Sequence, residues 1–317
     1  MSDAIVIASQ LDDRLNQLVR ERVPGAQVIE VAPGAIHALP TEAEVLFVRP
    51  LGPHGVDLSA PPPPGWPFGV RWVQLASAGI DFYPGWLFDG PVVTSARGTA
   101  AEPIAEFALA TIFAAAKHLP DSWIHQANDW KWQPVTLLKG STLGIFGFGA
   151  IGQALARKAL ALGFKVITVR RTDAEPEVAG VQRVADIGAL FAQADHVVLA
   201  APATAATRHI VNAQVLAQAK PGLHLVNVAR GSLIDDDALL GALAAGKIAL
   251  ASLDVTEPEP LPADHPYYSH PRVRLSPHTS AISPGIFANL ADRFIQNLQA
   301  WRSGATLTDV VDPQRGY

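Results

Sequence analysis

A glycine-rich segment in the middle of the chain constrains the fold more than any other stretch of this sequence. Residues 143–146 are apolar and are followed by the turn GFGAIG at 147–152, an Ala- and Leu-rich run to Leu162, Gly163 and a second apolar run at 165–169. This order of strand, G-x-G-x-x-G turn, helix and strand is typical of a βαβ unit that binds a dinucleotide. The sequence therefore predicts a nucleotide-binding unit here.

The three glycines of the turn have separate physical roles. Gly147 permits a tight turn, Gly149 lets the backbone approach a pyrophosphate, and Gly152 lets the helix lie close to the strand. The pyrophosphate is expected at the helix N-terminus, where N–H groups and the helix dipole favour anions. We expect the whole turn to contact the cofactor, and a purely structural turn is the alternative: Gly147, Phe148, Gly149, Ala150, Ile151 and Gly152.

The end of the second strand indicates which dinucleotide is bound. An NAD-selective site has Asp or Glu there to accept a hydrogen bond from the ribose 2′-hydroxyl, whereas this chain has Arg170, Arg171 and Thr172. Two guanidinium groups and a hydroxyl suit a 2′-phosphate, because arginine binds phosphate in a bidentate way. The sequence predicts NADP(H). NAD(H) stays open as the alternative, because a shift of the loop would bring Asp173 to the ribose.

Composition excludes several classes of function. Of the 317 residues, 49% are hydrophobic and 17% charged, which is enough apolar material for two domain cores. The net charge of -5, without a basic run, argues against a nucleic-acid-binding face. The chain has no cysteine, so it has no disulfide or thiolate metal site, and we expect no metal.

The hydrophobic runs and the first residues indicate the compartment. The apolar runs are shorter than the roughly 20 residues that a membrane-spanning helix needs. The first ten residues, MSDAIVIASQ, contain an acidic residue and no basic region, so no signal peptide is expected. We expect a cytoplasmic protein without membrane contacts.

Strands and helices are expected to alternate along most of the chain. Short apolar runs predict strands at 4–9, 27–31, 44–48, 71–75 and 91–95, and at 196–200, 223–228, 248–255 and 273–275. This alternation predicts an α/β protein with two doubly wound parallel-sheet domains, Rossmann-like or flavodoxin-like, and a ligand cleft between them. A last helix, with Ser283 and Pro284 expected as N-cap and first residue, should return to the first domain.

Three polar segments follow strands of the second domain, at 227–231, 253–262 and 276–279. Ligands of open α/β sheets bind beyond the carboxyl ends of the strands, so these segments are expected near a nicotinamide.

The side chains in these segments suit the reduction of a 2-keto acid. Arg230 can hold the carboxylate and polarise the carbonyl, and His278 can donate a proton to the developing alkoxide. Glu259 beside His278 would favour the imidazolium, with Glu257 as its rival. Because the chain has ten histidines, His278 is a weak signal by itself.

The chain resembles the D-isomer-specific 2-hydroxyacid dehydrogenase family over nearly its whole length. The resemblance lies in GFGAIG at 147–152, APATAATRHIVN at 201–212, NVARGSLID at 227–235, LDVTEPEPLP at 253–262 and SPHTSA at 276–281. It implies hydride transfer from a reduced nicotinamide to a 2-keto acid. It also implies catalytic roles for Arg230 as substrate anchor, His278 as acid and base, and Glu259 as the partner of His278.

The same resemblance implies the domain boundaries and the remaining binding residues. A discontinuous substrate domain, 1–99 plus 285–317, would enclose an NAD(P)-binding Rossmann domain at 100–284. On spacing alone residues 76–79 are a plain turn, but the resemblance implies that Ser77, Ala78 and Gly79 bind the substrate carboxylate. Further cofactor contacts are expected at Ala201, Pro202, Thr207, Val228, Ala229 and Asp254, the last at the nicotinamide carboxamide.

These observations predict a reductase that converts a small 2-keto acid, such as glyoxylate or hydroxypyruvate, to the D-2-hydroxy acid with NADPH. The lack of an acidic residue at position 170 makes the chain similar to the glyoxylate/hydroxypyruvate reductase branch of the family. Two alternatives stay open: an NAD-dependent dehydrogenase of a bulkier D-2-hydroxy acid, and a non-catalytic dinucleotide-sensing regulator. The family's mode of association implies a homodimer formed around the helix expected at 100–117 and the Trp-rich segment after it.

Overall fold

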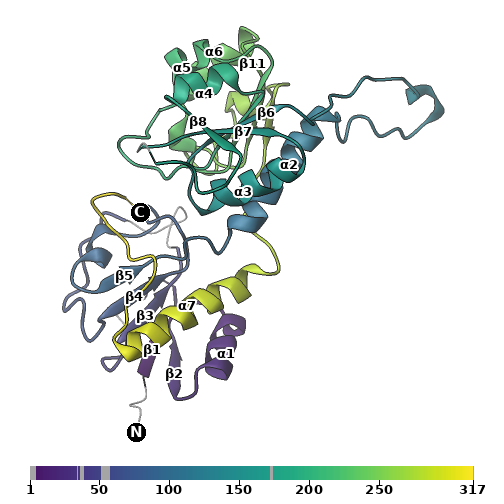
Figure 1. Ribbon diagram of the computed structural model, residues 1–317. Helices are drawn as coiled ribbons and strands as arrows, with labels where there is room; N and C mark the ends of the chain where they lie inside the picture. The colour runs from purple at the N-terminus through teal and green to yellow at the C-terminus, as the bar shows by residue number, and fades with distance from the viewer. Residues whose placement is uncertain (1–4, 34, 36–38, 51–57, 172–173, 317) are drawn as a thin grey trace. The chain divides into compact units, whose positions relative to one another are not determined.

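The computed structural model describes residues 5–33, 35, 39–50, 58–171 and 174–316. The chain divides into two compact units (Figure 1). Unit 1 consists of Met1–Ala100 and Ser283–Tyr317, and unit 2 is Ala101–Ile282. The C-terminal helix therefore belongs to the same unit as the N-terminal strands.

Unit 1 is built on a five-stranded, all-parallel sheet with the order β2-β1-β3-β4-β5. Every residue of β3 and β4, two of the three inner strands, is buried, as expected where both faces of a parallel sheet are covered. The elements are β1 (Ile5–Ser9), α1 (Asp13–Arg22), β2 (Ala26–Glu30), β3 (Val45–Val48), β4 (Trp72–Leu75), the 3₁₀ helix η2 (Gly85–Phe88), β5 (Val92–Thr94) and α7 (Ile286–Ser303).

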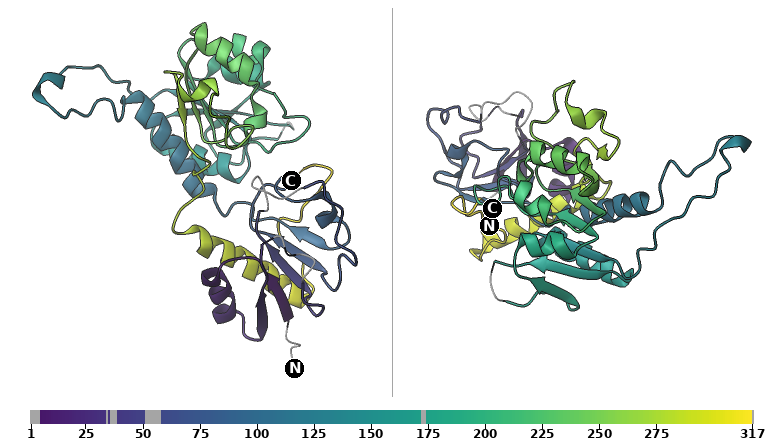
Figure 2. Two further views of the ribbon diagram at one scale, coloured as in Figure 1. Left: turned by 180° about the vertical axis from the view of Figure 1, so that it is seen from behind. Right: turned by 90° about the horizontal axis from the view of Figure 1, so that it is seen from above.

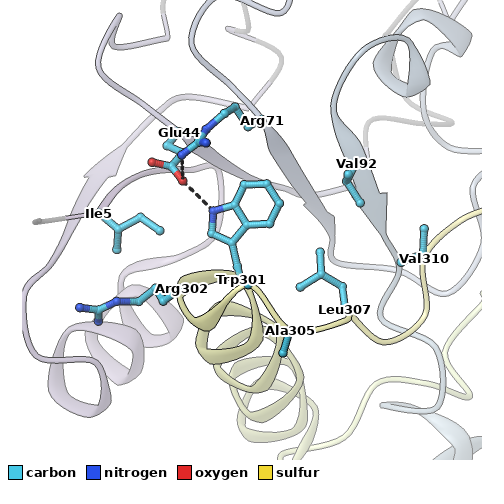
Figure 3. A pocket seen from close by; sticks show the side chains of 10 residues that line it. Ile5, Glu44, Arg71, Val92, Trp301, Arg302, Ala305, Leu307 and Val310 are labelled. Atoms are coloured by element: carbon cyan, nitrogen blue, oxygen red, sulfur yellow. Dashed lines mark hydrogen bonds and ion pairs between the residues drawn. The ribbon is translucent and has the colours of Figure 1, made fainter. Parts of the chain in front are cut away.

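Helix α7 is attached to the sheet of unit 1 by aromatic side chains. Phe294 is fully buried and stacks on Phe47 and Trp72, with ring centroids 4.4 and 5.3 Å apart. Near the helix end, the Trp301 indole donates a 2.6 Å hydrogen bond to Glu44, which also forms an ion pair with Arg71 (Figure 3). The last helix thus completes the core of the first unit.

The start of α7 differs from the sequence prediction. Ser283 and Pro284 were predicted to be the N-cap and the first helical residue, but the helix begins at Ile286 with Gly285 as its cap. Pro284 and Gly285 lie in a separate turn, in which the Ser283 carbonyl accepts a hydrogen bond from the Ile286 N–H. The cap prediction was wrong because a favourable Ser-Pro pair also suits the turn that precedes a helix.

Unit 2 is built on a seven-stranded parallel sheet with the order β12-β11-β10-β9-β6-β7-β8. The strands are β6 (Thr142–Phe146), β7 (Lys165–Val169), β8 (Val181–Val184), β9 (His196–Leu199), β10 (Leu223–Asn227), β11 (Ile248–Leu253) and β12 (Val273–Leu275). The first strand of the unit lies centrally and the order reverses beside it, which is the doubly wound arrangement of dinucleotide-binding domains.

The helices of unit 2 cover both faces of this sheet, α2 and α3 on one face and α4 to α6 on the other (Figure 1). They are α2 (Ala101–Ala116), α3 (Ala150–Ala161), α4 (Ile187–Gln193), α5 (Ala213–Ala217) and α6 (Asp236–Ala244), with 3₁₀ helices η3 (Ala127–Asp129), η4 (Gly231–Leu233) and η5 (Pro266–Tyr268). None of the helices in the described ranges is both long and apolar enough to span a membrane.

The predicted α/β class with two parallel sheets is confirmed. One strand was not predicted: β8 forms the edge of the larger sheet and reads VQRV, with Gln182 and Arg183 exposed. An edge strand with one apolar residue at each end lacks the apolar run that identified the other strands. The cleft between the domains stays a prediction.

A long arm, residues 118–137, leaves unit 2 between α2 and β6 and extends away from its sheet (Figures 1 and 2). Its base is closed where the Thr136 N–H bonds to the Ala116 carbonyl at 2.9 Å and Lys117 Nζ donates to the Thr136 carbonyl at 2.6 Å. Trp123, Trp130 and Trp132 on the arm are 63%, 74% and 98% exposed. These indoles make an apolar surface that unit 2 itself does not cover.

Candidate active site

The predicted cofactor and catalytic residues of unit 2 come together at one edge of its sheet. They follow the carboxyl ends of six strands: Gly147 follows β6, Arg170 β7, Ala201 β9, Val228 β10, Asp254 β11 and His278 β12. Because all seven strands are parallel, these ends lie at the same edge, which is where open α/β sheets bind ligands.

The glycine-rich turn has the shape that a dinucleotide requires. Gly147 has φ +104°, and a Cβ added there would overlap the backbone of Ala200 and Ala201. A Cβ at Gly152 would overlap the Gly147 carbonyl. Helix α3 starts at Ala150 with no side-chain cap, so the anion-binding N-terminus that the fold offers is not occupied by its own side chain. The turn therefore fits a pyrophosphate.

The segment after β9 lies against this turn. Thr207 holds the segment by donating a 2.7 Å hydrogen bond from Oγ1 to the Pro202 carbonyl and accepting one of 2.8 Å from the Thr204 N–H. The Thr207 hydroxyl is thus engaged within its own turn. Direct contact of Ala201, Pro202 and Thr207 with a cofactor stays a prediction.

Arg170 at the end of β7 forms an ion pair that the sequence did not indicate. Its Nη1 lies 2.6 Å from Oε2 of Glu177, in the loop before β8, and the Arg170 side chain is 17% exposed. The hydrogen bond from Arg170 lowers the pKa of the Glu177 carboxyl. Arg171 is exposed, whereas the predicted contact Thr172 and its rival Asp173 lie outside the described residues.

The loop after β10 presents Arg230 and is organised by Asn227. Asn227 is fully buried, accepts a 3.0 Å hydrogen bond from the Ala229 N–H and donates one of 2.8 Å to the Arg230 carbonyl. Val228 and Ala229 are buried as well. Asn227 lies in the NVARGSLID motif, but its role in holding this loop was not predicted from the sequence.

His278 and Glu259 are in direct contact. Nδ1 of His278 lies 2.8 Å from Oε2 of Glu259, and Oε1 of Glu259 accepts a 3.0 Å hydrogen bond from the Thr256 N–H. Burial alone would raise the pKa of Glu259, but the hydrogen bonds from His278 and Thr256 and the nearby positive charges outweigh it and lower that pKa. An ionised carboxylate only accepts hydrogen bonds, so Nδ1 of His278 carries the proton in this contact.

The rival carboxylate does not take this position. Glu257 forms an ion pair with Arg208, with Nη2 and Oε2 3.0 Å apart. Of the two glutamates in the TEPEP segment, Glu259 is therefore the one that contacts the His278 ring.

Asp254 organises the loop that carries His278. The residue is 2% exposed, and its carboxylate accepts hydrogen bonds from the Ser276 hydroxyl at 2.6 Å and from the N–H groups of Thr279 and Ser280 at 3.0 Å each. Burial would raise the pKa of Asp254, but these hydrogen bonds lower it, so the group is ionised at neutral pH. The sequence predicted a nicotinamide contact for Asp254, which stays a prediction, and missed this structural role.

The predicted substrate loop lies in unit 1, after β4. The Ser77 hydroxyl donates to the Gly79 carbonyl at 2.7 Å, so the contact of 3.0 Å with Tyr83 is a hydrogen bond from the tyrosine. Burial raises the pKa of Tyr83, which keeps its hydroxyl protonated as a donor. Since the Ser77 side chain is used within the loop, a carboxylate would have to bind the backbone N–H groups of Ser77, Ala78 or Gly79.

Unit 1 also contains a cavity of about 760 Å³ that none of the predicted site residues lines (Figure 3). Ile5 and Val92, at the starts of β1 and β5, line it together with Arg71 and Trp301. It therefore opens at the amino-terminal edge of the sheet, opposite to the edge at which α/β sheets bind ligands. In the described part of the chain, no cluster of three or more His, Asp or Glu side chains suits a metal ion.

The fold and the glycine-rich turn define the class of this protein as a dinucleotide-binding α/β protein. Residues 109–280 match the family model described as "D-isomer specific 2-hydroxyacid dehydrogenase, NAD binding domain". The chain belongs to the D-isomer-specific 2-hydroxyacid dehydrogenase family, as the resemblance in the sequence predicted.

Relatives and solved structures cover most of the chain. A glyoxylate/hydroxypyruvate reductase A of Serratia proteamaculans is 35% identical over 260 residues, 78% of this chain and 82% of that protein. A family member from Xanthobacter autotrophicus, solved in complex with NADPH and MES, is 28% identical, with a TM-score of 0.81 over 100% of both chains. An NADPH-dependent glyoxylate/hydroxypyruvate reductase of Sinorhizobium meliloti, solved with NADP and malonate, is 27% identical, with a TM-score of 0.76 over 98% of this chain and 97% of that one.

Proposed function

We propose that this protein reduces a small 2-keto acid, of the glyoxylate or hydroxypyruvate kind, to the D-2-hydroxy acid with NADPH. The observation that carries the proposal is the 2.8 Å contact between His278 Nδ1 and Glu259 Oε2, in which Glu259 is itself held by the Thr256 N–H. A histidine oriented by a partly buried carboxylate is an arrangement that suits a general acid.

The proposed mechanism assigns one task to each member of the trio. Arg230 binds the substrate carboxylate and polarises the keto oxygen. Nε2 of His278 donates the proton to the developing alkoxide, because Nδ1 is bonded to Glu259. Glu259 accepts the hydrogen bond from Nδ1 of His278 and so fixes the orientation of the ring. The nicotinamide supplies the hydride when the cofactor is bound, and unit 2 would hold the pyrophosphate of that cofactor at the turn at 147–152.

NADPH as the preferred cofactor is supported by Arg170 and Arg171 at the end of β7, since guanidinium groups suit a 2′-phosphate. The solved relatives with bound NADPH or NADP point in the same direction. We propose that residues 100–284 bind the cofactor and that residues 1–99 with 285–317 bind the substrate carboxylate through the loop at Ser77.

The test is a substrate panel with both cofactors. We expect NADPH oxidation with glyoxylate or hydroxypyruvate, and turnover abolished in His278→Ala while NADPH binding is retained. Turnover by His278→Ala would contradict the role of His278. A wild-type protein that binds NADPH but oxidises it with no 2-keto acid would indicate a dinucleotide-sensing regulator instead. Faster turnover with NADH and a bulkier keto acid would support the NAD-dependent alternative.

We propose further that the protein is a homodimer that covers the arm. Three exposed indoles are more apolar surface than a monomeric segment usually leaves in water. Light scattering after size-exclusion chromatography is expected to give twice the chain mass for the wild type and a monomer for Trp130→Ser with Trp132→Ser. A wild-type monomer at micromolar concentration would contradict this proposal.

A further inference from the structure

The ion pair between Arg170 and Glu177 places an anion of the protein at the side chain that is proposed to bind the 2′-phosphate. The Arg170 side chain is 17% exposed and Glu177 is 48% exposed, with Nη1 and Oε2 2.6 Å apart. Both groups belong to the segment between β7 and β8, so the pair is formed within unit 2.

We infer that Glu177 competes with the 2′-phosphate of NADPH for Arg170 and thereby limits the preference of this protein for NADPH over NADH. The inference rests on the proposed NADP(H) site, and it adds a residue that determines cofactor specificity.

The competition follows from the chemistry of the two anions. A carboxylate and a phosphate accept hydrogen bonds from the same N–H groups of a guanidinium. A 2′-phosphate brought to Arg170 therefore either displaces Glu177 or lies next to its negative charge. Both outcomes cost free energy that a neutral 2′-hydroxyl does not incur, since a hydroxyl can donate to the carboxylate and accept from the guanidinium.

The burial of the two side chains determines which partner moves. Arg170 is mostly shielded, so its attraction for an anion is screened less than that of a surface pair. Glu177 is half exposed and can turn into water at little cost. The carboxylate thus acts as an exchangeable partner of Arg170, and the penalty falls on NADPH alone.

The experiment measures dissociation constants of NADPH and NADH by cofactor fluorescence, without substrate, for wild type, Glu177→Gln, Arg170→Ala and the double variant. Glu177→Gln is expected to lower the constant for NADPH by about fivefold, the size that a partly exposed ion pair supports. The constant for NADH should change by less than about twofold. In the Arg170→Ala background the gain from Glu177→Gln should disappear, because the two residues act through each other.

Glu175→Gln is the matched control, because Glu175 is an exposed carboxylate of the same loop and its replacement removes the same charge. It is expected to leave both constants unchanged. A similar gain from Glu175→Gln, or a gain from Glu177→Gln that persists in the Arg170→Ala background, would show a general charge effect and overturn the inference. Weaker NADPH binding by Glu177→Gln would also overturn it, since Glu177 would then position Arg170 for the phosphate.

The variants of this experiment distinguish a failure of the inference from a failure of the proposed cofactor site. If Arg170→Ala leaves NADPH binding unchanged, the 2′-phosphate site itself is wrong. If Arg170→Ala weakens NADPH binding and Glu177→Gln does not strengthen it, the cofactor proposal stands and the competition is refuted.

Discussion

At the residue scale, two carboxylates near His278 have different roles. Glu259 contacts the imidazole ring, whereas Asp254 binds the Ser276 hydroxyl and the N–H groups of Thr279 and Ser280 around it. His278 itself has a positive φ of 51°, a conformation that its neighbours must hold. The orientation of His278 thus depends on Asp254, a side chain that has no part in the proposed proton transfer.

Replacing Asp254 with Asn tests this structural role. The NH₂ group of the Asn side chain would face a backbone N–H group that Asp254 accepts from, so a buried N–H donor would lose its acceptor. We expect a loss of about 1–3 kcal/mol in the free energy of unfolding, together with reduced turnover. Urea denaturation and steady-state kinetics measure both, with Asp237→Asn on the exposed start of α6 as control. Full stability of Asp254→Asn would contradict the role.

The lowered pKa of Glu259 predicts that the free energy of unfolding depends on pH. Its pKa is lowered in the folded protein, so the charged form contributes stability above its unfolded pKa of about 4.3, and this is lost as the pH falls through the folded pKa. The difference in unfolding free energy between wild type and Glu259→Gln should be largest near neutral pH and shrink in acid. Denaturation series over this range measure it. A difference that grows in acid would contradict the prediction.

At the element scale, the loops after β10 and β11 touch through a glycine. A Cβ at Gly231 would overlap the backbone of Thr256 and Glu257, so only glycine lets the Arg230 loop lie against the segment that carries Glu259. The proposed catalytic trio therefore depends on a contact between these two loops and not on either loop alone.

Gly231→Ala is expected to displace the segment at 256–259 and lower turnover, with a loss of stability of about 1–3 kcal/mol from overpacking. Gly241→Ala is the control: Gly241 lies in α6 with nothing near its added Cβ, and the change should stabilise by roughly 0.5–1 kcal/mol. Thermal unfolding and kinetics of both variants measure the contrast, and normal turnover of Gly231→Ala would refute it.

Strands β9 and β10 contain a buried histidine pair. Nδ1 of His196 and Nδ1 of His224 are 3.4 Å apart, and His224 Nε2 is 2.9 Å from the Ser252 hydroxyl. Burial, with smaller contributions from His196 and Arg274, lowers the pKa of His224 to about 3. Burial lowers the pKa of His196 too.

A histidine kept neutral when folded makes stability fall in acid. Below the unfolded pKa of about 6.5 the unfolded chain binds a proton that the native site refuses, at a cost of about 1.4 kcal/mol per pH unit down to the folded pKa. Urea unfolding between neutral and acidic pH should therefore show a shallower decline for His224→Gln than for wild type. Parallel declines would contradict a neutral His224.

At the scale of the whole molecule, each unit has a core of its own. The core of unit 1 includes Phe294, which α7 brings back to Phe47 and Trp72, whereas Phe191 is fully buried within unit 2. The two units are expected to be stabilised separately.

Phe294→Ala should cost about 3–5 kcal/mol and increase hydrogen exchange in unit 1, with unit 2 unaffected. Phe191→Ala should do the reverse. Hydrogen-exchange mass spectrometry of both variants measures the distribution. An equal increase in hydrogen exchange in both units of either variant would show that the two cores unfold as one cooperative unit.

Local patterns of the sequence were sufficient for most of the elements, though not for the edge strand β8, and for naming the candidate site residues. Apolar runs predicted the strands, and the turn at 147–152 predicted the nucleotide unit, because backbone preferences and short-range periodicity act within a few residues. The family motifs singled out Arg230, Glu259 and His278. The structure contains the contact between Glu259 and His278.

The tertiary structure decided which groups contact one another across loops. Four contacts join residues from different loops or from the two ends of one loop. They are the ion pair of Arg170 with Glu177, the hydrogen bonds of Asp254 to the His278 loop, the ion pair of Glu257 with Arg208, and the close approach of Gly231 to Thr256. A sequence pattern reports what each residue can bind, but the partner is selected by packing, when loops from neighbouring strands are brought to one edge of the sheet.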